Sequence, residues 1–547
     1  YLERRYASRS VRLFGTFLGI CHYAVYIGIV LFGPGIALQA VTDFPLWASI
    51  LVVAIAAIIY TSLGGIKAVI WTDVFQSLVM FLGIFAILIK GTMVAGGPSK
   101  VWNINANSGR LKLFDFDPDP TIRHTFWSLL IGSTLRGIGL TFNQSTVQRI
   151  SSTQSMKEAT TVMLIVGPAF FITLSLTSIE GLVAYAYYHT IGCDPLASKQ
   201  IKNPNQIVPF MVMDIFREAP GMPGLFMASV MSASLSTLSS GLSSLSALTW
   251  EDIIKPHVKF VNERKATLIA KSLVVFYGLL AIGIAFLIET IGGPLSQISM
   301  SLLSSFQGPL AGIFLLSAFI PRATQTGAIS GGIIGVTLVL WISLGQNFSP
   351  TIKKTPWLQP APIDQCYEDG LNSTFNNFTQ ISTFYSRLTT TVSPVSISTL
   401  NTKEDTLNYN LRSGLDKLYS MSYQWFGALG CIVTVVMGIS VSYATGAADP
   451  SKVDERYILP FFDQLFCCLP EKLRKRLRFG IDYQKKRSET IDVYKGYEVP
   501  IDNPEVMPSL EKHDTINTNS GSEYPVMSLL PNSEETTSNY DQETKNV

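Results

Sequence analysis

Hydroxyl side chains follow one face of the apolar segment between Gly224 and Thr249. The positions that share this face, at spacings of three and four residues, are Ser229, Ser232, Ala233, Ser236, Ser240 and Ser243. Hydroxyl oxygens and freed backbone carbonyls can replace the water around a sodium ion without adding a charge. Small residues also allow helices in a membrane to pack closely. The stripe therefore indicates either ion binding or helix packing.

A second apolar segment, Thr125–Gln144, contains an arginine. Arg136 and Asn143 are seven residues apart and would share one helix face, where the guanidinium could bind a small carboxylate with two hydrogen bonds. Three glycines between positions 132 and 139 are typical of a discontinuous helix that exposes amide groups to an anion. Because a charge inside a membrane is costly, the alternative is a structural ion pair between Arg136 and Glu180 of the next segment.

Asp73 stands at the beginning of another apolar segment, Asp73–Val94. A carboxylate at a membrane boundary usually has a partner or a task. The alternative is that an aspartate in the first helical turn complements the helix dipole.

These residues belong to an unusually apolar chain. Of its 547 residues, 47% are hydrophobic and 15% are charged, compared with about 25% charged residues in soluble domains. The net charge of +2 gives no basic field for nucleic acid. About 20 apolar residues cross a bilayer as a helix. We therefore predict ten membrane spans: Val11–Gln39, Leu46–Leu63, Asp73–Val94, Thr125–Gln144, Thr161–Tyr187, Gly224–Thr249, Ala266–Ile288, Pro294–Ile320, Ala328–Leu344 and Gln424–Tyr443.

The basic residues predict the topology. Lys and Arg gather before the first span and after the second, fourth, sixth and eighth spans, which places both ends of the chain in the cytoplasm. The 345–423 loop is then extracellular, and it contains N-glycosylation sequons at Asn372 and Asn377. Residues 1–446 form the predicted transmembrane domain, and residues 447–547 a cytoplasmic, largely disordered tail.

Two cysteines fall in loops on the predicted outer side. Cys193 and Cys366 lie where the redox environment permits a disulfide. Two free or separately paired thiols are the alternative.

Four motifs together resemble the sodium/solute symporter family, and within it most closely the branch of sodium-coupled monocarboxylate and multivitamin carriers. They are Gly64-Gly-Ile-Lys-Ala68 with Thr72-Asp-Val-Phe-Gln76, Asn143-Gln-Ser-Thr-Val-Gln-Arg149, Cys193-Asp-Pro195 and Trp250-Glu-Asp-Ile-Ile-Lys-Pro256. The resemblance covers roughly residues 1 to 460. It implies an all-α polytopic membrane protein with an inverted-repeat (LeuT-like) transporter fold. Because the sequence opens at Tyr1, we expect the first three transmembrane helices of that fold to be missing from this chain.

The resemblance also implies where ligands bind. It places sodium at the Ala233 carbonyl and at the hydroxyls of Ser236 and Thr237, and it gives Asp73 a role near the inner ion exit. Asn143 and Gln144 resemble the polar exit of the family's broken helix. We expect a break at Gly308-Pro309 in the segment Pro294–Ile320, with a mere kink as the alternative. Ser301 stands roughly one helical stretch before that pair, where sugar carriers of the family hold a glutamine, which disfavours a sugar. Arg136, Asn143, Gln144 and Ser301 are therefore the predicted substrate residues.

We accordingly predict a sodium-coupled secondary symporter that moves a small organic anion, a monocarboxylate or a vitamin, into the cell across the plasma membrane by alternating access. Its predicted partners are the anion, sodium as the coupling ion and the lipid bilayer, with no organic cofactor and no nucleic acid. No paired nucleophile and base lies near a membrane face, so an enzyme is not expected. The alternatives are a non-transporting channel or sensor on the same fold and a truncated inactive isoform.

Overall fold

Long apolar helices make up most of what the computed structural model describes, which is residues 1–42, 44–63, 66–112, 114–219, 221–258, 262–349, 358–366, 414–450 and 453–459. Only the backbone is described at 66–70 and 455. These residues all belong to a unit that runs from Tyr1 to Asp482, and a second unit, Tyr483–Val547, lies outside them. The sequons at Asn372 and Asn377 also lie outside the described residues.

Within the described ranges, nine helices are long and apolar enough to cross a membrane. They contain α2 (Arg9–Thr42), α3 (Leu46–Leu63), α4 (Ile66–Val94), α8 (Met156–Ile191), α10 (Met222–Leu248), α11 (Glu263–Ile291), α12 (Leu295–Phe319), α13 (Gln325–Phe348) and α17 (Phe426–Ala444). Shorter pieces are α1 (Leu2–Tyr6), α5 (Pro98–Asn107), η1 (Ser128–Gly132), α6 (Ser133–Thr141), α7 (Gln144–Ser151), η2 (Pro204–Gln206), α9 (Ile207–Ile215), η3 (Thr249–Ile254), η4 (Lys255–His257), α16 (Leu415–Tyr419), η6 (Tyr423–Trp425) and η8 (Glu455–Tyr457). Nine of the ten predicted spans correspond to the long helices, and the fourth is broken into η1, α6 and α7.

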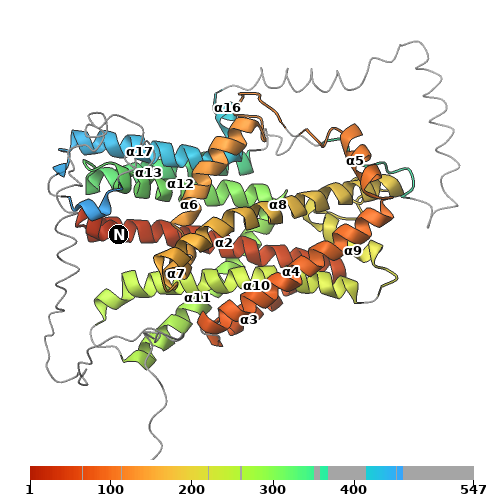
Figure 1. Cartoon of the computed structure of the whole chain (residues 1–547), viewed down its shortest axis with the longest axis horizontal. Helices are drawn as coiled ribbons and strands as arrows, with labels where there is room; N and C mark the ends of the chain where they lie inside the picture. Colours follow the sequence, from red (N-terminus) through yellow and green to blue (C-terminus); the bar gives the residue numbers. More distant parts are fainter. Residues whose placement is uncertain are drawn as a thin grey trace, which may run out of the picture. The chain divides into compact units, whose positions relative to one another are not determined.

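Helix α2 runs through the middle of the bundle (Figure 1). It packs against α3, α10 and α11 on one side and against α12 on the other, where α12, α13 and α17 form a group of their own. Ile27, Ile50 and Leu245 are completely buried in the core shared by α2, α3 and α10. Aliphatic side chains therefore fill one half of the bundle.

The ends of α8 follow from local signals in the sequence. The Ser155 side chain accepts a hydrogen bond from the Glu158 amide at 3.2 Å, and the Glu158 carboxylate accepts one from the Gln154 amide at 3.0 Å. The helix ends at Gly192, whose φ of 75° suits glycine. These caps extend α8 beyond the predicted span of 161–187 at both ends.

Helix α12 does not break at Gly308 and Pro309, so the predicted interruption is wrong. A Cβ on Gly308 would lie 2.5 Å from the Gly427 carbonyl oxygen of α17. The glycine is thus required by the close approach of α17 and not by a turn. Helix α13 continues to Phe348, inside the predicted 345–423 loop. Leu459, in the predicted tail, donates its amide hydrogen to the Ala318 carbonyl at 2.9 Å.

The packing of α13 on α17 yields a stability prediction. A Cβ at Gly331 would lie 2.5 Å from the Thr434 carbonyl oxygen and 2.9 Å from the Gly438 Cα. Since backbone must move, Gly331→Ala should destabilise the purified full chain by about 1–3 kcal/mol, measured by thermal unfolding in detergent. The matched control is Gly283→Ala on α11, where a Cβ meets nothing within 4 Å and the helix should gain up to about 1 kcal/mol. Equal shifts in the two variants would contradict this packing.

Candidate functional site

A cavity of about 470 Å³ lies between α2, the start of α7 and the ends of α10 and α12. Its lining is Tyr1, Leu2, Glu3, Arg4, Arg12, Gly15, Thr16, Gly19, Tyr23, Phe142, Asn143, Gln144, Leu248, Asp252, Leu310 and Phe314. The basic residues near the chain start place this cavity at the end of the bundle that the sequence predicts to be cytoplasmic.

The predicted fourth span contains a break beside the cavity. The chain leaves helical geometry at Asn143, with φ −67° and ψ 138°, between α6 and α7. A discontinuous helix was expected, but the break separates Arg136 from Asn143, so the predicted shared helix face does not exist. Asn143 and Gln144 line the cavity, whereas Arg136 does not.

Arg136 lies against a different part of the bundle. Its Nη1 contacts the Met300 sulfur of α12. Within the described residues it forms no ion pair with Glu180, because α6 packs against α12 and α17 while α8, which carries Glu180, packs mainly against α4 and α5. The predicted structural ion pair is therefore wrong.

Ser301 follows Met300 and is completely buried. It accepts a hydrogen bond from the Asn347 side chain of α13 at 3.1 Å and donates one to the Ile298 carbonyl at 3.0 Å. The structure does not bring the four predicted substrate residues together. Asn143 and Gln144 lie at the cavity, and Arg136 and Ser301 lie along α12, outside its lining.

The predicted sodium residues of α10 come together with Asp73 of α4. The Ser236 hydroxyl donates a hydrogen bond to Asp73 Oδ1 at 2.6 Å, and Thr237 donates one to the Ala233 carbonyl at 3.0 Å. Helix α4 begins at Ile66, so Asp73 lies beyond its first turn. The alternative that Asp73 only complements the dipole at the helix start is therefore wrong.

Arg149, at the end of α7, is a partner of Asp73 that the sequence analysis missed. Its Nη2 lies 2.8 Å from Asp73 Oδ2 and 2.6 Å from the Ser240 hydroxyl. The side chain of Asp73 is 18% exposed and that of Arg149 is 57% exposed, so the pair forms at the edge of the bundle and is partly screened by solvent. The sequence feature that could have identified Arg149 is its position at the end of the polar motif that begins at Asn143.

The hydroxyl stripe on α10 packs closely at one end and faces charged side chains further along. Ser229 is 5% exposed, and a Cβ on Gly83 of α4 would lie 2.5 Å from its hydroxyl oxygen, so this end of the stripe allows close packing. About two and three turns further along, Ser236 and Ser240 instead face Asp73 and Arg149.

A polar network joins three elements at the mouth of the cavity. Arg12 of α2 donates to Asp252 Oδ1 at 2.8 Å through Nε and to Glu3 Oε2 at 2.6 Å through Nη1. Thr16 donates a further hydrogen bond to Asp252. The network connects α1, α2 and η3. In the sequence, Arg12 was only one of the basic residues that predict the topology.

Arg5 of α1 is buried, with 5% of its surface exposed. It donates hydrogen bonds to the carbonyls of Ser317 at 2.9 Å, Ile320 at 2.9 Å and Pro321 at 3.1 Å, at the end of α12. Burial lowers the pKa of the Arg5 guanidinium below its usual value, but carbonyls at a helix C-terminus carry partial negative charge and stabilise the cation. Arg5 thereby fixes α1 beside the cavity.

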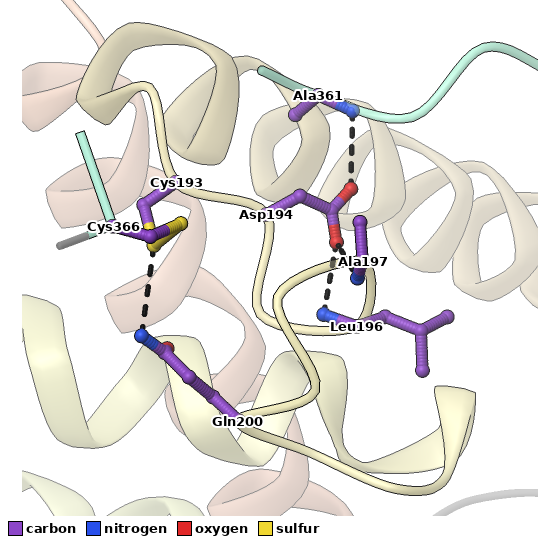
Figure 2. The surroundings of a disulfide bond; sticks show 7 residues. All are labelled: Cys193, Asp194, Leu196, Ala197, Gln200, Ala361 and Cys366. Carbon is purple, nitrogen blue, oxygen red and sulfur yellow. Dashed lines mark hydrogen bonds between the residues drawn. A yellow bond between two sulfur atoms is a disulfide. The ribbon is translucent and has the colours of Figure 1, made fainter. Parts of the chain in front are cut away.

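Cys193 and Cys366 are joined by a disulfide, with their Cα atoms 4.8 Å apart (Figure 2). Beside it, the Asp194 carboxylate accepts hydrogen bonds from two amides of its own turn and from the Ala361 amide at 3.0 Å. The Asp194 amide also donates to the Pro362 carbonyl at 3.0 Å, and the Gln365 amide donates to the Gly192 carbonyl at 3.1 Å. The segment 358–366 is therefore attached to the loop that follows α8 by a disulfide and three hydrogen bonds.

Comparisons with known proteins show the family and the fold of this chain. The family model described as "Sodium:solute symporter family" matches residues 1–335. The sodium-dependent multivitamin transporter of Oryctolagus cuniculus is 37% identical over 479 residues, which are 87% of this chain and 71% of that protein. The sodium-coupled monocarboxylate transporter 1 of Homo sapiens is 37% identical over 462 residues, 84% of this chain and 72% of that protein.

A solved structure of a Na+-coupled sialic acid symporter, in a substrate-bound outward-open state, shares the fold. Its TM-score is 0.58 at 20% identity, over 82% of this chain and 77% of that one. The helix bundle and this likeness define a multi-pass membrane protein with a LeuT-like transporter fold. The chain belongs to the sodium:solute symporter family. It is a transporter and not an enzyme, and sodium is its coupling ion, as the sequence predicted.

The disulfide yields a second stability prediction. Because the bridge restricts the unfolded chain, Cys193→Ser combined with Cys366→Ser should lower stability by about 2–4 kcal/mol, measured by thermal unfolding of the purified full chain. Reductant should lower the melting temperature of the wild type toward that of the double variant and leave the variant unchanged. Cys21→Ser, which removes a free thiol, is the control and should respond to reductant like the wild type. A wild type insensitive to reductant would contradict the bridge.

Proposed function

We propose that this chain is a sodium-coupled symporter that carries a small organic anion, a monocarboxylate or a vitamin, into the cell across the plasma membrane by alternating access. The hydrogen bond between Ser236 and Asp73 is the observation that carries the proposal. It joins a carboxylate to the hydroxyl stripe of α10, and α7 connects this point to Asn143 and Gln144 at the cavity. The substrates named for the two relatives support the class of anion.

The oxygens around Ser236 suit a sodium ion. Asp73 Oδ1, the hydroxyls of Ser236 and Thr237 and the Ala233 carbonyl are offered by two neighbouring helices, α4 and α10. A carbonyl oxygen has two lone pairs, so the Ala233 carbonyl can accept from Thr237 and still coordinate an ion. Arg149 occupies Asp73 Oδ2 and leaves Oδ1 to be shared between Ser236 and sodium.

The anion would meet two groups of polar residues along its path. Arg136, which contacts Met300 of α12, and Ser301, buried in α12, lie nearer the predicted outer side, and Asn143 and Gln144 lie at the cavity. At the cavity mouth the Arg12 charge is balanced by Glu3 and Asp252, whereas Arg4, in the part of the chain that is described, has no carboxylate partner. An anion leaving through the cavity would therefore pass a positive charge at Arg4.

The proposed orientation places the two chain ends and the cavity in the cytoplasm. The Cys193–Cys366 bridge then lies outside the cell, as do the 345–423 loop and its sequons at Asn372 and Asn377, which would carry N-linked glycans. Basic loops at one end of the bundle and a disulfide at the other support this orientation.

The direct test is uptake of radiolabelled lactate, nicotinate or biotin by cells that express the full chain. We expect uptake of at least one of these anions in sodium medium and its loss when choline replaces sodium, because the ion gradient supplies the driving force. Uptake that is equal in both media would refute symport. Sodium currents without anion accumulation would favour the channel alternative.

The ion site yields a separate prediction. Ser236→Ala combined with Thr237→Ala removes two oxygens, and the sodium concentration for half-maximal uptake should rise about tenfold or more, since about 1.4 kcal/mol corresponds to a factor of ten. The matched control is Ser243→Ala, in the same stripe two turns further along, which should leave this concentration unchanged. An unaltered value in the double variant would remove the proposed site.

A further inference from the structure

The first amides of α7 need hydrogen-bond acceptors that the helix itself cannot supply. Asn143 occupies the N-cap position, and asparagine is one of the residue types that usually cap a helix start. Here, however, the Asn143 side chain makes no capping hydrogen bond. Because a buried amide without an acceptor is costly, an acceptor from another element stabilises this helix start.

Tyr23 of α2 supplies the acceptor. Its hydroxyl oxygen accepts a hydrogen bond from the Ser145 amide at 3.1 Å and lies 2.7 Å from the Ser145 hydroxyl. The Tyr23 ring is 3% exposed and belongs to the hydrophobic core around α2. A phenol can donate and accept at once, so a single buried hydroxyl serves both Ser145 groups.

Tyr23 also lies in the wall of the cavity, next to the residues at the break. Tyr23, Asn143 and Gln144 all line it. Since the amide of Ser145 is already satisfied by Tyr23, the Asn143 carboxamide is not needed as a cap and can face a ligand in the cavity.

The other end of α7 is attached to the proposed ion site. Arg149 binds Asp73 and Ser240 there, four residues after Ser145. Helix α7 is therefore held at its start by Tyr23, beside the proposed substrate residues, and at its end by the residues proposed to bind sodium. A displacement at one end moves the other end, because the helix between them is only eight residues long.

We propose that Tyr23 is a positioning residue for transport: its hydroxyl caps α7, frees Asn143 for the anion and fixes the start of the helix through which the anion and sodium sites are coupled. The role in capping rests on geometry alone, and the role in coupling rests on the proposed function.

The test compares Tyr23→Phe with Tyr277→Phe. Tyr277 is also buried, and its hydroxyl bonds to Thr249 at 2.6 Å, away from the cavity lining. Tyr23→Phe should raise the KM for the anion about fivefold with a much smaller change in maximal rate, and by linkage it should also raise the sodium concentration for half-maximal uptake. Tyr277→Phe should change neither. A merely structural loss would lower the maximal rate through reduced surface expression and leave KM unaltered.

Hydrogen–deuterium exchange of the purified full chain tests the hydrogen bond between Tyr23 and the Ser145 amide independently of transport. Peptides that cover Gln144–Ser151 should exchange about fivefold faster in Tyr23→Phe than in the wild type or in Tyr277→Phe. Ser145→Ala keeps the amide and should leave this exchange near the wild-type rate. Unchanged exchange in Tyr23→Phe would overturn the cap, and faster exchange with unchanged KM would overturn the positioning of Asn143. If the wild type takes up no anion, the proposed function fails and the coupling role falls with it, whereas exchange still decides the cap.

Discussion

A backbone amide inside a bilayer must find an acceptor nearby, and the break at Asn143 leaves the first amides of α7 without one from their own helix. The surrounding helices supply hydrogen-bond partners at both ends of α7. Helix α2, at the centre of the bundle, brings Tyr23 to the start of α7, while α4 and α10 bring Asp73 and Ser240 to Arg149 at its end. Tyr23 of α2 thus satisfies one of the amides at the break, while α4 and α10 hold the other end of α7 through Arg149.

The two halves of the bundle are stabilised in different ways. Aliphatic side chains such as Ile27 and Leu245 fill the space between α2, α10 and α11, whereas glycines bring α12, α13 and α17 almost into backbone contact, as at Gly308 and Gly331. In lipid, helix association is stabilised largely by such close packing, since apolar side chains gain little by leaving the equally apolar lipid tails. The group of α12, α13 and α17 is therefore rigid. Within it, α12 lines the cavity, and α12 and α17 contact α6.

The sequence predicts the helices well because length and apolar content alone decide whether a segment can span a membrane. It also identifies the stripe on α10, whose period is local. It identifies the distant pair Cys193 and Cys366, because both fall in loops on the predicted outer side, but it misses distant partners that share no such signal. Arg149 meets Asp73 across 76 positions, and Arg5 meets the end of α12 across more than 300, so neither pairing leaves a local trace. The shared face expected for Arg136 and Asn143 fails for a different reason, since it assumes one continuous helix across the break. At Gly308-Pro309 the error is the opposite one: the pair predicts a break, but α12 continues through it.

The charges around α7 suggest how an ion could influence the cavity. Asp73 is shared: one carboxylate oxygen faces Ser236 and the other binds Arg149. On the proposed ion site, sodium at Oδ1 would place a second positive charge beside the same carboxylate and weaken its hold on Arg149. The end of α7 would then be less firmly attached, while Tyr23 continues to fix its start. Linkage requires the reverse effect as well, so an anion that holds Asn143 and steadies α7 must also change the affinity for sodium. On the proposed sites, a short helix attached at both ends would connect the anion and sodium without any contact between them.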